Sequence, residues 1–327
     1  MAENEDLLVV EDLKTYFFTK AGIVKAVDGV SFTVKFGEAL GIAGESGCGK
    51  SITCASIMQL LPKPAGRIVG GKIIFDGEDL LTKSEADMIA IRGKKIGMIL
   101  QDPLMSLNPV YTIGNQVGES FQLDKVRGAL VKQKSINVLS SVKIPSAAER
   151  LGSYPFQFSG GMRQRTSAAI AIARAPKLLI ADEPTTSLDV TIQDQFLKLL
   201  KEMQRNNNMA LIMVTHDLGI VAEVCDRVAI MYAGRIVETG TVARVYENPG
   251  HPYTQALMHA IPRLDRKARR LFQIEGEPPN PAKLPSGCYF HPRCPKVIDI
   301  CHNEYPPTVP MGNDGYAACW LLKKGDS

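Results

Sequence analysis

The sequence predicts an α/β protein with a parallel main sheet, because short apolar runs alternate with helical patterns before residue 249. Each run is brief and almost continuously apolar, which is typical of parallel strands that helices cover on both faces. Between the last two runs, apolar residues recur at the spacing of one helix face. The runs are Ala39–Ala43, Lys95–Leu100, Leu178–Asp182 and Ala210–Thr215, and the stripe contains Ile192, Phe196, Leu199, Leu200 and Met203.

The N-terminal segment follows a different pattern. Apolar and polar residues alternate through Leu7–Phe18 and again through Val24–Val34. A period of two indicates strands with one buried face. We therefore expect a small N-terminal antiparallel β subdomain beside the parallel sheet.

A glycine-rich loop follows the first predicted strand of the sheet. The segment Gly44–Ser51 matches GxxxxGK[ST] and lies between a strand and a predicted helix, Ser51–Leu61, as this motif requires. Its glycines allow the backbone N–H groups to face a phosphate, and the helix N-terminus adds partial positive charge. The pattern predicts a P-loop NTPase, with Lys50 on the β- and γ-phosphates and Ser51 on Mg²⁺. The predicted nucleotide contacts here are Gly44, Glu45, Ser46, Gly47, Cys48, Gly49, Lys50, Ser51 and Ile52.

Two acidic residues end the strand Leu178–Asp182. Four apolar residues lead directly into Asp182 and Glu183, which favours a catalytic role over an ordinary pair of acids before Pro184. We expect Asp182 to hold the Mg²⁺ shell and Glu183 to act as the general base on the attacking water.

A second possible anion site lies in Phe158–Arg165, FSGGMRQR, where Ser159 is a plausible cap for a helix over Gly161–Arg174. With the P-loop and the two acids, this segment resembles the signature motif LSGGQ of the ATP-binding cassette (ABC) family. Phe158 and Met162 depart from the signature at its two ends, while its Ser-Gly-Gly core is intact. The resemblance implies a head-to-tail dimer in which Ser159, Gly160 and Gly161 cover the γ-phosphate of ATP bound to the other subunit.

Other positions match the ABC motifs residue by residue. Gln101 resembles the Q-loop glutamine that senses Mg²⁺ and water, and Ser187-Leu188-Asp189 resembles the D-loop that bridges the dimer. His216 resembles the switch histidine on the γ-phosphate. Phe17 resembles the aromatic residue that stacks on adenine, although the neighbouring Tyr16 and Phe18 are alternatives.

A narrower resemblance covers nearly the whole chain. The segments Gln101–Pro109 and Phe158–Arg165, with His251-Pro-Tyr-Thr-Gln-Ala-Leu, resemble the ATP-binding subunits of oligopeptide and dipeptide importers. This implies an ATPase motor on the cytoplasmic face of the membrane, paired with an identical or paralogous subunit. Its other partners would be two permease subunits and, indirectly, an extracytoplasmic peptide-binding protein. A nickel complex is the alternative cargo.

The composition changes near Asn248–Pro249. Nine of the 20 prolines lie between Pro278 and Pro310, and four of the seven cysteines lie after this point. We therefore predict an ATPase domain over residues 1–248, with a helical subdomain at about 103–165, and a small loop-rich domain over residues 249–327. The basic run Arg263–Arg270 is read as a solvated face, or as one near lipid headgroups or the permease.

Four cysteines lie in the predicted C-terminal domain, residues 249–327: Cys288, Cys294, Cys301 and Cys319. They lack the close pairs of zinc ribbons, and thiolates from proline-rich loops suit a [4Fe–4S] cluster, as the peptide-importer resemblance also implies. Zinc and free thiols are the alternatives, and His291 and His302 are possible spare ligands. Cys48, Cys54 and Cys225 are expected to be packing thiols.

Charge and hydropathy bear on three classes of protein: nucleic-acid-binding, membrane-spanning and secreted proteins. The chain has 327 residues, 45% of them hydrophobic, and a net charge of +4, which does not indicate a nucleic-acid partner. No uncharged apolar stretch reaches the about 18 residues of a membrane span. The acidic start MAENEDLL lacks the layout of a signal peptide.

The rival function is a non-transport ABC ATPase acting on DNA or ribosomes, which often carries two cassettes or a coiled-coil insertion. A redox sensor built around the cysteines is a third class.

Overall fold

The computed structural model describes residues 6–102, 106–186, 188–261, 273–312 and 315–323. Its contacts divide the chain into two compact units. Unit 1 contains Lys35–Ala39 and Thr82–Val214, and unit 2 contains Asp6–Val34, Leu40–Leu81 and the chain from Thr215 onward. Each unit is described by itself.

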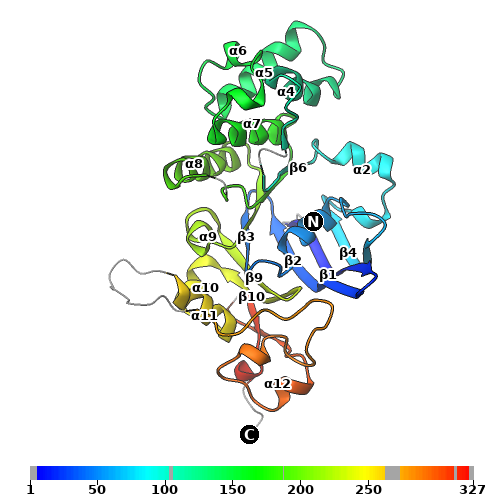
Figure 1. Cartoon of the computed structure of the whole chain (residues 1–327), viewed down its shortest axis with the longest axis vertical. Coiled ribbons are helices and arrows are strands. Elements are labelled where there is room, and N and C mark those ends of the chain that lie inside the picture. The colour runs from blue at the N-terminus through cyan, green and yellow to red at the C-terminus, as the bar shows by residue number, and fades with distance from the viewer. Residues whose placement is uncertain (1–5, 103–105, 187, 262–272, 313–314, 324–327) are drawn as a thin grey trace, which may run out of the picture. The chain divides into compact units, whose positions relative to one another are not determined.

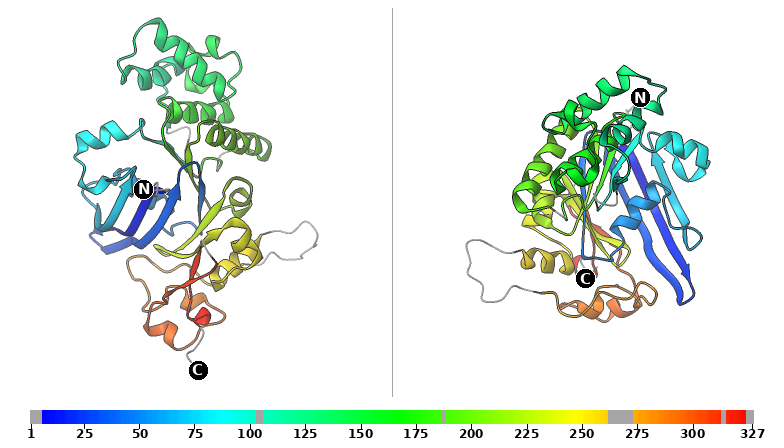
Figure 2. Two further views of the ribbon diagram at one scale, coloured as in Figure 1. Left: turned by 180° about the vertical axis from the view of Figure 1, so that it is seen from behind. Right: turned by 45° about the horizontal axis from the view of Figure 1, so that its top comes forward.

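Unit 2 contains a four-stranded sheet in the order β2-β1-β4-β5. Strands β1 (Asp6–Thr19) and β2 (Gly22–Lys35) are the long blue ribbons in Figure 2, and β4 (Gly66–Phe75) pairs antiparallel with β1 and with β5 (Glu78–Asp79). This sheet is the predicted antiparallel subdomain, with β4 and β5 as strands that the alternation pattern did not predict.

The other strands of unit 2 follow the order β11-β12-β10-β9-β3. Strand β3 (Ala39–Ala43) runs parallel to β9 (Arg227–Tyr232), and β9 turns back antiparallel into β10 (Arg235–Thr241). Strands β12 (Tyr316–Ala318) and β11 (Thr308–Pro310) extend this edge. Among the described residues, the proline-rich region supplies two short strands, and Pro310 lies in β11 at the outer edge, where proline's missing N–H is tolerated.

The helices of unit 2 are short. α1 (Lys50–Ile57) follows the glycine-rich loop, and α9 (Leu218–Val224), α10 (Val242–Glu247) and α11 (Pro252–Ala260) lie later in the chain. The cysteine-rich region contains α12 (Ile300–Asn303) and the 3-10 turns η3 (His291–Arg293) and η4 (Trp320–Leu322).

Unit 1 contains the parallel strands β8 (Ala210–Thr215), β7 (Leu178–Asp182) and β6 (Ile96–Ile99), in that order. β7 and β8 are buried along their whole length, as their almost continuous apolar sequences predict. The helices are α2 (Glu85–Ile91), α4 (Ile113–Gln122), α5 (Ala129–Ser141), α6 (Ala147–Arg150), α7 (Gly160–Ile172) and α8 (Val190–Asn206). Figures 1 and 2 show α4, α5 and α7 packed together at one end of this unit.

The predicted fold class is confirmed, and three of the four predicted strands have the predicted bounds. Strand β6 is shorter by one residue at each end. The domain boundary at residue 248 and the helical subdomain at about 103–165 stay predictions. Ser187, the basic run Arg263–Arg270 and residues 103–105 of the Gln101–Pro109 motif lie outside the described residues. Within the described ranges, no helix is long and apolar enough to cross a membrane.

Candidate nucleotide-binding and hydrolysis site

The glycine-rich loop of unit 2 connects β3 to α1, as the P-loop pattern predicts. Gly44, Gly47 and Gly49 all have positive φ angles, of +156°, +77° and +107°. A Cβ atom at Gly44 would lie 2.1 Å from the Met231 carbonyl oxygen, and one at Gly49 would lie 2.3 Å from that of Ala26. These two glycines are therefore required sterically, whereas Gly47 is required for its backbone angle.

Lys50 is buried at the start of α1 and its ammonium group folds back over the loop. Its Nζ donates hydrogen bonds to the carbonyl oxygens of Gly44 (2.8 Å) and Glu45 (3.0 Å). The ammonium thus lies where the loop closes, which is the place a phosphate-binding lysine needs. Ser51 and Ile52 are half-buried in the first turn of α1, and Ser46 is exposed on the loop.

Cys48 is buried beneath the loop, and burial raises the pKa of its thiol. It is therefore a neutral packing group, as predicted. Cys54 and Cys225 are also buried.

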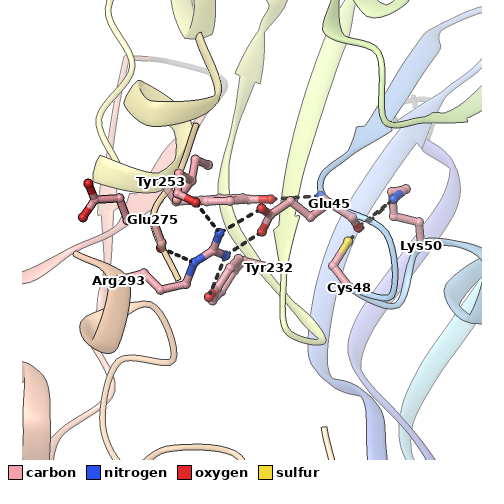
Figure 3. A network of polar contacts seen from close by, with 8 residues as sticks. Glu45, Cys48, Lys50, Tyr232, Tyr253, Glu275 and Arg293 are labelled. Carbon is pink, nitrogen blue, oxygen red and sulfur yellow. Dashed lines mark hydrogen bonds and ion pairs between the residues drawn. The ribbon is translucent and has the colours of Figure 1, made fainter. Parts of the chain in front are cut away.

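The loop residue Glu45 is tied to the C-terminal region, a contact that the sequence patterns did not reveal. Arg293 donates from Nη1 to Glu45 Oε2 (2.7 Å) and from Nη2 to Oε1 (3.0 Å), a two-pronged ion pair. The Glu45 N–H donates to the hydroxyl of Tyr253 (2.9 Å). Figure 3 shows both groups converging on Glu45 while Lys50 approaches from the other side of the loop. Tyr253 belongs to a motif noted in the sequence, but Arg293 stands among cysteines without a local signal.

In unit 1, the two acids follow β7 as predicted. Asp182 is the last residue of the strand and is buried. Glu183 has a φ angle of +44°, a strained conformation for a residue with a side chain, and its N–H donates to Val214 O (2.9 Å). Its carboxylate oxygen Oε2 accepts hydrogen bonds from Gln101 Nε2 (3.1 Å) and Thr186 Oγ1 (3.1 Å). The structure thus brings together two of the three predicted catalytic residues.

The Ser-Gly-Gly segment begins α7. The Ser159 hydroxyl accepts the Met162 N–H (3.3 Å), which confirms the predicted helix cap. A Cβ atom at Gly161 would lie 2.6 Å from Ile192 Cγ2, whereas one at Gly160 would meet no atom within 4 Å. Gly161 therefore permits α7 to pack against α8, and Gly160 is open to a ligand. Asp189 caps α8 by accepting the Ile192 N–H (3.0 Å).

The remaining predicted site residues belong to unit 2. His216 is exposed immediately after β8. Phe17 is half-buried near the end of β1, and the Phe18 ring lies beneath the Arg67 guanidinium. The Tyr16 hydroxyl donates to Asp28 (2.6 Å), so this residue is engaged elsewhere. Phe17 and His216 as nucleotide contacts stay predictions, as does the joining of the loop to the residues of unit 1.

The four C-terminal cysteines line one small pocket, together with His291. All four are free thiols, Cys301 and Cys319 buried and Cys288 and Cys294 half-buried. Burial, with the neighbouring cysteines adding to it, raises the pKa of Cys288 to about 11. Over the described residues, no group of three or more His, Cys, Asp or Glu side chains that could hold a metal ion is found. The spare-ligand candidates His291 and His302 pack their rings against each other, with centroids 4.5 Å apart.

Comparison with solved structures defines the class. The fold matches a dimeric structure of the ATP-binding cassette MJ0796 bound to ADP and Pi, with a TM-score of 0.64 at 24% identity over 72% of this chain and 98% of that one. It also matches CbiO1 from Clostridium perfringens, with a TM-score of 0.65 at 27% identity over 75% of this chain and 92% of that one. Residues 27–186 match the family described as ABC transporter. The fold and these matches define an ABC-type ATPase.

Residues 237–301 match the family described as the oligopeptide/dipeptide transporter C-terminal region. The chain is 47% identical over 318 residues to the dipeptide transport ATP-binding protein DppD of Bacillus subtilis, which covers 97% of this chain and 95% of that protein. It is 47% identical over 315 residues to the oligopeptide transport ATP-binding protein OppD of Salmonella typhimurium, covering 96% and 93%. The chain therefore belongs to the family of ATP-binding subunits of peptide ABC transporters.

Proposed function

We propose that this protein is the ATP-hydrolysing motor subunit of an importer for dipeptides or oligopeptides. The observation that carries the proposal is the pairing of Gln101 with Glu183 at the ends of β6 and β7, in a chain that also carries a complete P-loop. Relatives named for dipeptide and oligopeptide transport, at 47% identity over nearly the whole chain, support the cargo.

In this mechanism, backbone N–H groups of Gly44–Ser51 and the ammonium of Lys50 bind the phosphates of ATP. Ser51 and Asp182 would hold Mg²⁺, which neutralises charge that develops on the phosphates. The Glu183 carboxylate takes a proton from water while the water oxygen bonds to the γ-phosphorus and the bond to the ADP oxygen breaks. Gln101 holds the Glu183 carboxylate in place, and His216 would contact the γ-phosphate.

The second half of the site is proposed to come from a partner subunit, identical or paralogous. Ser159, Gly160 and Gly161 would cover the γ-phosphate of the ATP that the partner binds. The open space at Gly160 and the N-terminus of α7 suit an anion there. Asp189 would lie at the dimer interface, and ATP would close the dimer.

A permease would dock on an exposed apolar patch of unit 1 that contains Val110, Tyr111, Tyr154 and Phe156. The N–H groups of Ile113 and Gly114 donate to the carbonyl oxygens of Ser153 and Leu151 (2.8 Å each), so the two segments that carry the patch are joined. Large exposed apolar patches are typical of protein interfaces. Two permease subunits, an extracytoplasmic peptide-binding protein and a peripheral place on the cytoplasmic face of the membrane complete the proposal, with no nucleic-acid partner.

The four cysteines are proposed to hold a [4Fe–4S] cluster. What supports it is that Cys288, Cys294, Cys301 and Cys319 line one pocket. Four thiolates on proline-rich loops suit a cubane iron–sulfur cluster, and zinc is the alternative occupant. The cluster would stabilise this proline-rich region, and binding would release the thiol protons.

Reconstitution tests the function directly. The protein is purified with the permease subunits and the peptide-binding protein of its transporter, and the complex is placed in lipid vesicles. Di- or oligopeptide should stimulate ATP hydrolysis and should accumulate in the vesicles. Stimulation by a nickel complex and not by peptide would contradict the proposed cargo, and stimulation by DNA or ribosomes would contradict transport.

A further inference from the structure

The C-terminal region contacts the phosphate loop through Arg293 and Tyr253. Its guanidinium binds both carboxylate oxygens of Glu45, at 2.7 and 3.0 Å. The Glu45 carbonyl oxygen in turn accepts the Lys50 ammonium (3.0 Å), and the Glu45 N–H donates to Tyr253 (2.9 Å). Glu45 is therefore held at its side chain, its N–H and its C=O. Through this single residue, Arg293 is linked to the phosphate-binding lysine (Figure 3).

Arg293 is itself held firmly. Its side chain is only 4% exposed, and Nε donates to the Glu275 carbonyl oxygen (3.1 Å). Nη1 also contacts the Tyr232 hydroxyl (3.3 Å). The ion pair with Glu45 raises the pKa of Arg293, so the guanidinium is charged at any pH at which the protein is folded.

A cluster of aromatic rings packs beside the Arg293–Glu45 ion pair. The rings of Tyr232, Tyr253 and Phe290 lie 4.6, 5.3 and 5.4 Å apart, and they come from β9, α11 and the cysteine-rich region. The Lys25 N–H donates to the Pro281 carbonyl oxygen (3.0 Å), so the proline-rich segment is also fixed beside the loop. The packing therefore holds Arg293 in one position relative to Glu45.

The negative charge of Glu45 connects the Arg293–Glu45 ion pair to the affinity for nucleotide. A carboxylate at the start of a phosphate-binding loop repels the phosphates unless a cation neutralises it. Arg293 supplies that cation from outside the ATPase motifs, and its forked geometry cannot be reproduced by lysine. Loss of Arg293 would leave the Glu45 charge uncompensated and would free the loop residue that accepts Lys50.

We propose that Arg293 is a positioning residue of the phosphate loop, through which the cysteine-rich region sets the affinity for nucleotide. The proposal rests on the assignment of Gly44–Ser51 as the ATP site. Arg293→Ala should weaken nucleotide binding about tenfold, a value within the range of measured couplings between sites. KM for ATP should rise by a similar factor while kcat changes little, because the hydrogen bonds of Arg293 go to the loop residue Glu45, to Tyr232 and to the carbonyl oxygens of Glu275 and Ile274.

Calorimetric titration of the full-length chain with MgADP, together with steady-state ATP hydrolysis, tests the proposal. Arg293→Lys should not restore affinity. Adding Glu45→Gln to Arg293→Ala should restore part of it, because the uncompensated charge is then removed; a merely structural role would predict further loss. Tyr289→Phe is the matched control, since the Tyr289 hydroxyl ties the same region to Asp28 (2.8 Å), which lies outside the loop Gly44–Ser51. Its affinity should equal that of the wild type.

Three results would overturn the proposal: unchanged affinity in Arg293→Ala, equal weakening in Tyr289→Phe, or no recovery on adding Glu45→Gln. The variant Lys50→Ala distinguishes a failure of the role proposed for Arg293 from a failure of the assignment of Gly44–Ser51 as the ATP site. If Lys50→Ala binds MgADP normally, the ATP site itself is wrong; if it loses binding while Arg293→Ala does not, only the role of Arg293 fails. Thermal unfolding of each variant identifies any that fail to fold.

Discussion

The side-chain amide of Gln101 donates a hydrogen bond of 3.1 Å to the carboxylate of Glu183. The two residues are 82 positions apart, but the register of the sheet brings them together. Ile99 of β6 pairs with Ala181 of β7, so Gln101 and Glu183 each stand two residues beyond paired positions of neighbouring parallel strands. Side chains that end adjacent parallel strands meet at the same edge of a sheet, which is where α/β proteins place their ligands.

This relationship predicts that Gln101→Ala should lower kcat of the dimer about 10- to 100-fold, because the general base is no longer oriented. Steady-state hydrolysis at saturating ATP measures it. Gln116→Ala is the control, since the Gln116 amide donates to the Asn108 and Tyr111 carbonyl oxygens instead, and its kcat should be unchanged. A wild-type kcat in Gln101→Ala would show that the hydrogen bond to Glu183 has no catalytic role.

The two signature glycines should respond differently to alanine. Gly161→Ala places a methyl group 2.6 Å from Ile192 Cγ2, where α7 packs on α8, and should lower the free energy of unfolding by about 1–3 kcal/mol. Gly160→Ala meets no atom within 4 Å and should leave it nearly unchanged. Urea denaturation of the nucleotide-free protein measures both; equal stabilities would contradict the packing role of Gly161.

A second prediction concerns Gly160, because we propose that the γ-phosphate of the partner's ATP lies beside this residue. Gly160→Asp places a carboxylate there and should block ATP-dependent dimerisation by repulsion between like charges. Sedimentation with and without ATP measures the dimer. The wild-type protein should be largely monomeric without nucleotide, and a stable nucleotide-free dimer would count against the composite site.

His251 predicts a pH dependence of stability. It is fully buried, its Nδ1 accepts the Tyr253 N–H (3.0 Å), and burial lowers its pKa to about 3. Because the unfolded chain binds a proton near pH 6.5 and the folded chain does not, stability is complete above about pH 6.5 and falls as pH drops toward 3. The slope from this residue approaches about 1.4 kcal/mol per pH unit.

Denaturation at pH 7.5 and 5.5 should therefore show a smaller loss of stability in His251→Asn than in the wild type. His302→Asn is the control, because it makes the same replacement at an exposed histidine. Identical slopes for the wild type and His251→Asn would mean that the buried imidazole is not neutral in the folded state.

The local motifs were predictable from the sequence because each depends on a contiguous segment. Strands β3, β7 and β8 are unbroken apolar runs, and the P-loop and the acids after β7 follow directly from them. Strand β9 is equally apolar, but such a run alone does not distinguish a strand from a buried helix, and its partner β10 is reached through a tight turn at Ala233 and Gly234.

The Arg293–Glu45 pair was not predictable in this way. The two residues are 248 positions apart, and no local pattern marks an arginine between cysteines as the partner of a loop carboxylate. The packing of Tyr232, Tyr253 and Phe290 and the hydrogen bonds that hold Arg293 bring the two charges together. Pairings of this kind depend on tertiary contacts, which periodicity and motif spacing do not contain.

The proposed cluster predicts that anaerobically purified protein is brown and carries about four irons per chain. Cys294→Ser should lose the colour and should expose the C-terminal region to protease, because the proline-rich chain buries little apolar surface of its own. Cys54→Ser, which changes a buried thiol of α1, should keep the colour. Stoichiometric zinc without iron after anaerobic purification would reject the cluster.

We propose Glu183 as the general base of an ATPase whose P-loop carries Lys50, and ATP turnover by Glu183→Gln tests this role. The variant keeps the shape of the side chain and the contact with Gln101 but cannot accept a proton from water. We predict that it binds MgATP, forms a dimer on sedimentation and hydrolyses ATP about 10²–10⁴-fold more slowly than the wild type. Lys50→Ala should instead lose nucleotide binding. Turnover by Glu183→Gln within about threefold of the wild type would show that Glu183 is not the general base.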